Sequence, residues 1–414
     1  MKWLDKLRHP ERYLWIFFKW GLLGIAIGAL GGLIGAGFHH ALHFVTGVRA
    51  ANNWLIFLLP LGGLATMAIY RLKPLRKNRG TNEIIDAVLD EKSVSPLVAP
   101  AMLVSTAITH LLGGSAGREG AALQIGGSVA STLGRALRLN DDDRTVLTMS
   151  GMSAVFAGLF GTPLTACLFT MEFEAVGTIF TPALLPCFLA AFVASQVAGL
   201  LGVHAEGAVI PTVTFNLGAA WRILVLAVAV AVLGIAMCWL FHKAEHLAHR
   251  FLPNSFLRIA VGGTVILGLT LLVGDHRFNG AGMDMALAAV EGQADWYSFL
   301  LKMLFTALTI AAGFKGGEIV PTFCVGATFG CVLGGALGLD PGVAAALGLI
   351  GLFCCVTNSP LASIVLSIEM FGGGNLHIFS LMCVIGFVLS GRSGLYVSQL
   401  LRFSKTSTTG ICRE

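Results

Sequence analysis

The stretch GSAGREGAALQIGG (Gly114 to Gly127) opens a long apolar run, and a similar stretch, FKGGEIVPTFCVG (Phe314 to Gly326), opens another. Glu119 of the first stretch and Glu318 of the second are 199 positions apart (318 − 119). Each stretch places closely spaced glycines and a carboxylate inside sequence that carries few charges. A duplicated, glycine-interrupted apolar chain is typical of membrane transporters that build their site between two halves.

Two further pairs of segments repeat in the same order. GTPLTACLFTMEFE (Gly161 to Glu174) corresponds to NSPLASIVLSIEM (Asn358 to Met370). RGTNEIIDAV (Arg79 to Val88) corresponds more weakly to NGAGMDMALAAV (Asn279 to Val290). We therefore predict two membrane repeats, residues 1–205 and 206–414, and the broken apolar segments favour an inverted orientation of one repeat relative to the other.

Composition places the chain in a membrane. It is 56% hydrophobic and 12% charged, whereas soluble domains carry about 25% charged residues. So few charges leave a surface that lipid must cover, and a spanning helix needs about 20 apolar residues. Clear candidates are residues 14–38, 54–70, 179–201, 221–241, 257–273 and 378–390, and shorter or broken ones include 121–137, 146–171, 299–312 and 319–337. We predict an all-α membrane protein with many short or broken helices and no cytoplasmic regulatory domain.

Basic residues cluster beside the first two apolar runs. They are Lys2, Lys6, Arg8 and Arg12 before the first run, and Arg71, Lys73, Arg76, Lys77 and Arg79 after the second. Cytoplasmic loops carry an excess of Lys and Arg, so the N-terminus is predicted to be cytoplasmic. Because these charges flank membrane segments and form no basic face, nucleic-acid binding is excluded.

The residues that would mark an enzyme or a metal site are not arranged for those roles. The nine cysteines have no CxxC spacing, and most lie inside apolar runs as small hydrophobic side chains do. The sequence shows no nucleophile–base pair. We therefore predict no enzymatic activity, no metal and no cofactor.

The repeated loops have the chemistry of an anion site. Glycine lets the backbone approach a ligand closely. The first turn of a helix offers unpaired N–H groups and a partial positive charge. Two such helix ends aimed at one point bind an anion without a full cation, which is costly inside a membrane.

Glu119 is the strongest candidate for a functional side chain. A carboxylate within an apolar membrane segment is expensive and is functional by default. When ionised it can occupy the anion site itself, and when protonated it can leave. The alternative is a structural ion pair with Arg118 or another arginine. Glu318, its counterpart, serves either proton traffic or structure, and the sequence leaves both open.

Three other side chains have competing interpretations. Glu172 and Glu369 follow the prolines of the repeated motif by nine residues, and we interpret both as helix-end or interface carboxylates bonded to backbone N–H groups. Tyr396 can donate its hydroxyl to a buried anion, although a lone tyrosine there is more often an interfacial anchor.

These motifs together resemble the CLC family of chloride channels and anion/proton exchangers. The resemblance rests on the GSAGREG loop, the GTPL loop with its helix ending in Glu, the GGExxP loop and the terminal LYxxQL segment, and it covers residues 14–401. It implies a homodimer in which each subunit has its own pore and an internal inverted repeat.

The resemblance also implies roles for individual residues. Glu119 matches the family's external gating glutamate, and Tyr396 matches the tyrosine that contacts the central anion. The implied anion-binding residues are Gly80, Thr81, Asn82, Gly117, Arg118, Gly120, Gly317, Glu318, Ile319, Val320 and Tyr396.

Several positions depart from the chloride-type pattern. Thr81 replaces the serine of the GSGIP loop, and the proline of that loop is absent. Phe173 occupies the position of the family's internal proton glutamate, Glu318 stands where many members carry an aliphatic residue, and Val320 stands where some fluoride-type members carry a hydroxyl. This combination is similar to the bacterial fluoride-exporting CLC branch.

We therefore predict an anion/proton antiporter of a bacterial inner membrane, exporting fluoride in exchange for protons, with the lipid bilayer, a small anion and a second copy of the chain as partners. The alternatives are a chloride/proton antiporter and a passive, voltage-gated-type chloride channel, because loss of the acid at Phe173 also suits a channel. A receptor or scaffold without transport leaves the repeated loops unexplained.

Overall fold

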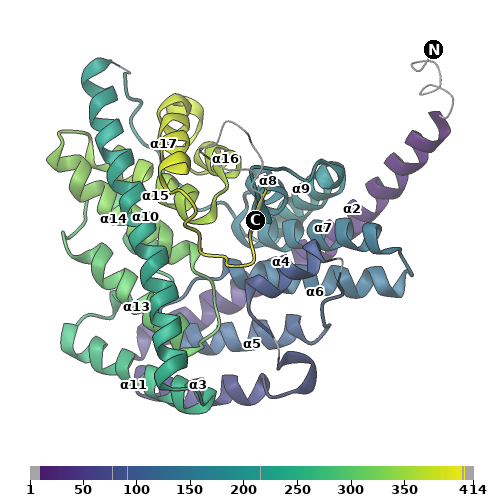
Figure 1. Ribbon diagram of the computed structural model, residues 1–414, viewed down its shortest axis with the longest axis horizontal. Helices are drawn as coiled ribbons and strands as arrows, with labels where there is room; N and C mark the ends of the chain where they lie inside the picture. Colours follow the sequence, from purple (N-terminus) through teal and green to yellow (C-terminus); the bar gives the residue numbers. More distant parts are fainter. Residues whose placement is uncertain (1–9, 77, 91, 215, 403–404, 406–414) are drawn as a thin grey trace.

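The computed structural model describes residues 10–76, 78–90, 92–214, 216–402 and 405. Most of the regular structure in this part of the chain is α-helical (Figure 1). The α-helices before residue 205 are α2 (Pro10–Ala51), α3 (Leu59–Ile69), α4 (Thr81–Leu89), α5 (Val98–Leu111), α6 (Glu119–Ala136), α7 (Asp141–Phe160), α8 (Pro163–Glu172) and α9 (Leu184–Leu200). The α-helices after it are α10 (Leu217–Phe251), α11 (Ser255–Val273), α12 (Met283–Val290), α13 (Ser298–Ala312), α14 (Ile319–Ala336), α15 (Pro341–Thr357), α16 (Pro360–Phe371) and α17 (Leu376–Leu389).

Short elements join these helices. The 3-10 helices are η1 (Asn53–Leu58), η2 (Lys73–Leu75), η3 (Thr181–Ala183), η4 (His276–Phe278) and η5 (Gly373–Asn375). Two strands, β1 (Ala175–Val176) and β2 (Leu400–Leu401), pair in parallel, with Ala175 opposite Leu400. These strands were not predicted, because two residues are too few to show the alternating pattern of a strand in the sequence. Of the basic residues used to orient the N-terminus, Lys2, Lys6, Arg8 and Lys77 lie outside the described residues, as does the side chain of Arg12.

Five helices of the described chain are long and apolar enough to cross a membrane. They are Tyr13–Ala51, Thr181–Leu200, Leu217–Phe251, Ser255–Val273 and Ile319–Ala336. Four of them match clear predictions from the sequence, and the fifth was placed among the shorter segments.

Two other predicted spans form shorter apolar helices, Asn53–Ile69 and Gly373–Leu389. The run at 54–70 is divided into η1 and the 11-residue α3, which begins with Pro60 in its first turn. The run at 378–390 forms the 14-residue α17. Proline lacks an N–H and favours a helix start, which is why the α-helical part of this run begins beside Pro60.

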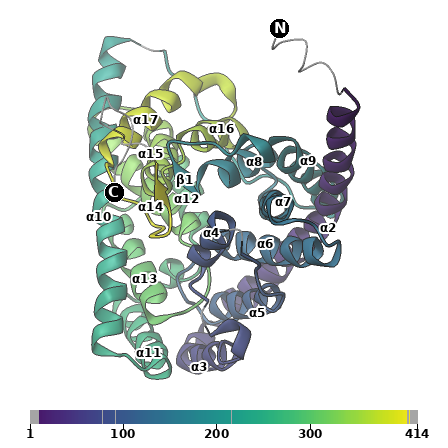
Figure 2. The same cartoon turned by 45° about the vertical axis from the view of Figure 1, so that its right-hand side comes forward.

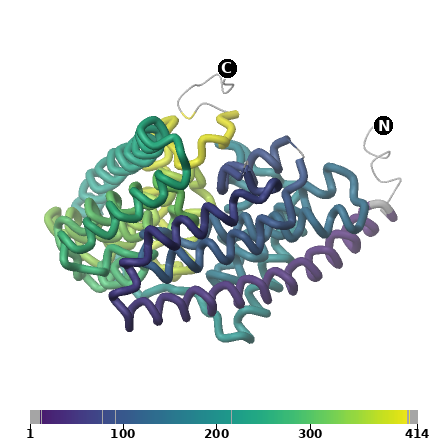
Figure 3. The backbone as a smooth tube through the Cα atoms, turned by 90° about the horizontal axis from the view of Figure 1, so that it is seen from below, coloured from purple at the N-terminus to yellow at the C-terminus, as the bar shows by residue number. Residues whose placement is uncertain are grey.

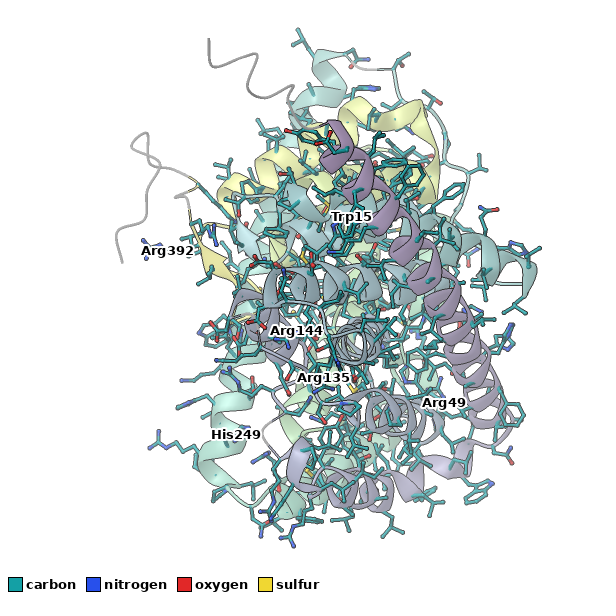
Figure 4. All side chains as sticks on the ribbon, turned by 90° about the vertical axis from the view of Figure 1, so that its right-hand side faces the viewer. Trp15, Arg49, Arg135, Arg144, His249 and Arg392 are labelled. Carbon is teal, nitrogen blue, oxygen red and sulfur yellow. The ribbon has the colours of Figure 1, made fainter. Side chains whose placement is uncertain are left out.

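The long helix α2 presents apolar side chains outward. Trp15 is 63% exposed and Leu22 is 70% exposed. Figure 3 shows α2 running along one edge of the molecule, and Figure 4 shows Trp15 and Arg49 near its opposite ends. Large exposed apolar side chains need a covering, and lipid supplies it in a helix of this length.

Corresponding helices pack alike on the two sides of the molecule. Helix α6 packs against α7 as α14 packs against α15, and α2 packs against α9 as α10 packs against α17. Helices of the first half gather on one side in Figure 1 and those of the second half on the other. Contacts of α3 with α11 and of α8 with α16 join the halves (Figure 2).

The buried helices α7 and α15 have matching ends. Asn140 accepts a 2.8 Å bond from the backbone of the first turn of α7, and Asp340 accepts a 2.9 Å bond in the same place on α15. Helix α7 ends at Gly161 with φ 70°, and α15 ends at Asn358 with φ 58°. Side-chain caps satisfy the first N–H groups and left-handed residues end the helix, which places the next loop.

Glu172 and Glu369 join the two halves through reciprocal caps. Glu172 accepts bonds of 3.1 and 2.8 Å from the backbone N–H groups of Leu361 and Ala362, in the first turn of α16. In return, Glu369 accepts two bonds of 2.9 Å from the first turn of α8. The interpretation of both residues as carboxylates bonded to backbone N–H groups is confirmed.

Removing one of these caps should loosen the contact between α8 and α16. Glu172→Gln removes the charge and turns one acceptor into a donor that faces the N–H groups of α16. We expect the free energy of unfolding to fall by about 1.5–3 kcal/mol, the range for hydrogen bonds to charged groups. The measurement is the half-life of the detergent-purified protein at raised temperature. Glu291→Gln, at an exposed carboxylate, is the matched control. Equal half-lives for the two variants would contradict the assignment.

Candidate anion site

The two glycine loops meet inside the molecule. Gly117 and Gly317 form an antiparallel bridge, in which the Gly117 N–H donates to the Gly317 oxygen at 2.6 Å and the Gly317 N–H donates back at 2.8 Å. Helix α6 begins at Glu119 and α14 begins at Ile319. Two helix N-termini from opposite halves therefore start side by side, as the sequence predicted for an anion site.

Glu119 lies between these loops, with Oε2 close to both Gly117 and Gly317. Its side chain is fully buried. Oε2 accepts a 3.1 Å bond from the Arg118 N–H, and the backbone amide of Val320 also stabilises the carboxylate. Oε1 is buried and has no hydrogen-bond partner among the described residues. The carboxylate therefore lies beside backbone N–H groups of both loops, and one of its oxygens has no hydrogen-bond partner among the described residues.

Close packing explains the glycines around this carboxylate. A Cβ atom on Gly117 would lie 2.4 Å from Glu119 Oε2, and a Cβ on Gly317 would lie 2.6 Å from the same atom. Such distances are too short for carbon and oxygen. Gly120 is restricted by the Thr81 hydroxyl, which would lie 2.7 Å from its Cβ.

The arginine beside Glu119 is paired elsewhere. The Arg118 guanidinium bonds to Glu206 at 2.7 Å and lies 3.4 Å from Nδ1 of His39. Its carbon also lies 4.9 Å from the centre of the Phe160 ring. The interpretation of Glu119 as locked in an ion pair with Arg118 is therefore wrong, because the guanidinium has another carboxylate as its partner.

The first predicted loop reaches the site through Thr81. Gly80 directly precedes α4. Its φ of 66° is a backbone conformation that suits glycine. The Thr81 hydroxyl faces Gly120. Asn82 is directed differently: its Oδ1 accepts a 3.0 Å bond from the Ser398 N–H and ties the loop to the C-terminal segment.

Tyr396 lies in the interior, and so the interfacial-anchor alternative is wrong. Its side chain is 5% exposed, and its hydroxyl is buried without a partner among the described residues. The hydroxyl lies within range of the charges of Glu318 and Glu119. Tyr396 also contacts the ring edge of Phe173, with ring centres 5.9 Å apart.

Phe173 stands where the family resemblance implies an internal proton glutamate, and aromatic rings pack against it. It is fully buried and stacks on Phe169 with ring centres 4.9 Å apart. Its backbone oxygen accepts a 2.6 Å bond from Gln399, which fixes the segment that carries Tyr396.

Glu318 and Val320 come from the start of α14. Glu318 is half-buried, and its charge interacts with those of Glu119 and Lys315. Val320 is buried and also lines a cavity that holds the Arg118 side chain. The structure therefore brings Thr81, all the predicted residues of the two glycine loops and Tyr396 to one region.

Lys302 was missed by the sequence reasoning. It is fully buried, and its Nζ donates to the Ser115 hydroxyl at 3.0 Å and to the backbone oxygens of Phe278 at 3.1 Å and Gly280 at 2.7 Å. The signal was available, because Lys302 is the single charge in the apolar run 299–312. Lys302 therefore joins the loop at Ser115 in the first half to the loop at Phe278 and Gly280 in the second half, and all its acceptors are neutral.

The fold and the site define a helical membrane protein in which paired helix N-termini surround a buried carboxylate. The chain belongs to the voltage gated chloride channel family, whose pattern it matches over residues 61–391. This confirms the resemblance to CLC proteins and the predicted fold class.

Individual relatives cover almost the whole chain. A protein of Pseudomonas syringae pv. tomato named "Chloride/fluoride channel protein" is 34% identical over 97% of this chain and 91% of its own. The "H(+)/Cl(-) exchange transporter ClcA" of Vibrio campbellii is 29% identical over 91% of this chain and 87% of its own. A crystal structure described as a CLC-type fluoride/proton antiporter superposes with a TM-score of 0.90 at 33% identity, covering 93% of this chain and 98% of that one.

Proposed function

We propose that this chain is a CLC-type antiporter that exports fluoride in exchange for protons. The observation that carries the proposal is Glu119: its buried carboxylate, with Oε1 unpartnered, lies where Gly117 and Gly317 join two helix N-termini. A group that takes an anion's place when ionised and leaves when protonated couples the two ions. The relatives whose names specify fluoride and antiport support the choice of ions.

In this proposal Glu119 is the gating and proton-coupling residue. The anion is bound by the loop that contains Thr81, by the backbone around Gly117 and Gly317, and by the Tyr396 hydroxyl. Fluoride is small and strongly hydrated, so it needs several close donors in place of its water. The unpartnered Tyr396 hydroxyl and the two helix starts supply such donors.

We further propose a homodimer in a bacterial inner membrane, with the N-terminus in the cytoplasm and the repeats divided at 205/206. The matching helix contacts of the two halves support the repeat boundary. The positive-inside pattern supports the orientation. A protease site placed before residue 10 and cut only from the cytoplasmic side would test the orientation.

Fluoride should leave vesicles faster than chloride, and protons should enter as it leaves. We expect a preference of at least tenfold, the ratio that about 1.4 kcal/mol of differential binding gives. The measurement uses vesicles loaded with equal fluoride and chloride at one fixed pH, with electrodes for both anions and for protons. Equal or faster chloride release would favour a chloride/proton antiporter, as the Vibrio relative is named. Anion release without proton uptake would favour a channel.

A further inference from the structure

The segment that joins the two halves is fixed in place by hydrogen bonds to the second half. We call residues 203–214 the connecting strap. The Ala208 N–H donates to the Met370 oxygen at 3.0 Å, and the Val213 N–H donates to Asn375 Oδ1 at 2.9 Å. The strap is therefore held by α16 and the turn after it, and a side chain on it has a defined position.

Glu206 of the strap is the partner of the arginine beside the gate. Glu206 Oε1 and Arg118 lie 2.7 Å apart, and their side chains are 32% and 12% exposed. The second oxygen of Glu206 is buried and has no hydrogen-bond partner among the described residues. Because the Arg118 backbone N–H binds Glu119, the ion pair lies one residue from the gating carboxylate.

This ion pair lines a cavity beside the start of α14. The cavity has a volume of about 240 Å³ and includes Val320, whose backbone faces Glu119. Its lining contains the arginines Arg49, Arg118 and Arg277 and four histidines, and Arg277 is ion-paired with Asp275 and Asp295 outside the cavity. The acidic side chains in the lining are Glu206 and Asp284.

Charge in this cavity decides how firmly an anion is held there. Buried Lys302 lies behind the cavity wall at Gly282 and is bonded to neutral acceptors, so its positive charge adds to those of the lining. Attraction between unlike charges is stronger in a partly buried site than in water. An unpaired Arg118 would therefore hold an anion in the cavity and slow its release.

We propose that Glu206 neutralises Arg118 and thereby lets the anion leave the cavity. The inference rests on the proposed function, because it assumes that an anion passes from Glu119 through this cavity. Glu206 acts through Arg118 and is a positioning residue. Its presence weakens anion binding and speeds release, since a site that binds too tightly limits conduction.

The test is a Michaelis analysis of anion efflux from vesicles, with fluoride and chloride measured separately. Glu206→Gln should lower KM and kcat together, each by about threefold to tenfold. A merely structural loss lowers kcat without tightening binding. Glu206→Asp should restore both values toward those of the parent. Asp141→Asn removes a carboxylate from another arginine pair, at the start of α7 outside the cavity, and should leave both unchanged.

Two further measurements keep the test decisive. If Glu206→Gln does not fold, a double variant with Arg118→Gln and Glu206→Gln removes both charges. It is compared with Arg118→Gln alone. We expect equal KM values for the two, because Glu206 acts through Arg118. Calorimetric binding of fluoride and chloride in detergent makes the same comparison without transport. An unchanged or raised KM, or unchanged binding, in Glu206→Gln would overturn the proposal. Proton uptake, recorded in parallel, tests the proposed function alone.

Discussion

Glu119→Gln should abolish proton uptake during anion movement. The variant keeps the size of the side chain but cannot bind and release a proton. It also loses the negative charge that competes with the anion at the Gly117–Gly317 bridge. We expect proton flux to fall to the level of protein-free vesicles, with anion flux either blocked or continuing as an uncoupled leak. The measurement records anion release and external pH from the same vesicles.

The control for this experiment is Glu291→Gln, which alters an exposed carboxylate at the end of α12. It should keep the parent's ratio of protons to anions. If Glu119→Gln exchanges protons for anions as the parent does, the role assigned to Glu119 is wrong, and Glu318 becomes the better candidate.

Gly317→Ala should reduce anion transport roughly a hundredfold, the loss that a displacement of about 1 Å causes in a positioned site. The new Cβ would lie 2.6 Å from Glu119 Oε2 and 2.8 Å from the Gly120 nitrogen. Relief of this clash requires the bridge to Gly117 to open or the carboxylate to move. The first change separates the two helix starts that form the site, and the second displaces the gating carboxylate. The measurement is the initial rate of fluoride efflux per reconstituted protein.

Gly268→Ala is the matched control, because a Cβ on Gly268 of α11 meets no atom within 4 Å. It should transport like the parent, and both variants should elute at the parent's volume in size-exclusion chromatography. Parent-like transport by Gly317→Ala would show that the packing around Glu119 is looser than the structure indicates.

The sequence predicted the meeting of the loops because the motif is duplicated. Two similar segments, Gly114–Gly127 and Phe314–Gly326, imply two similar helix starts, and a membrane chain with broken helices must shield both in its interior. The same duplication predicted that Glu172 and Glu369 bind backbone N–H groups. Tyr396 joined the site only through the family resemblance, since no repeat includes it.

The rest depended on tertiary contacts that no local pattern records. Arg118 and Glu206 are 88 residues apart, and their ion pair is set by how the strap is bonded to Met370 and Asn375. In the sequence, Glu206 lies in none of the repeated motifs. The bounds of α14 were predicted closely, at 319–337, but this segment was grouped with the shorter or broken ones because its glycines and Pro321 resemble interruptions. In the structure Pro321 lies in the first turn of α14, where proline is compatible with a helix.

The most direct test of the account is whether a proton gradient moves fluoride uphill. Vesicles contain and are surrounded by equal fluoride near neutral pH, the membrane potential is held at zero, and the outside is then acidified. We predict that protons enter and fluoride leaves against its own growing gradient, whereas leakage of HF would carry fluoride inward. No net fluoride movement, or inward movement equal to that of protein-free vesicles, would contradict the assignment of this chain as a fluoride/proton antiporter.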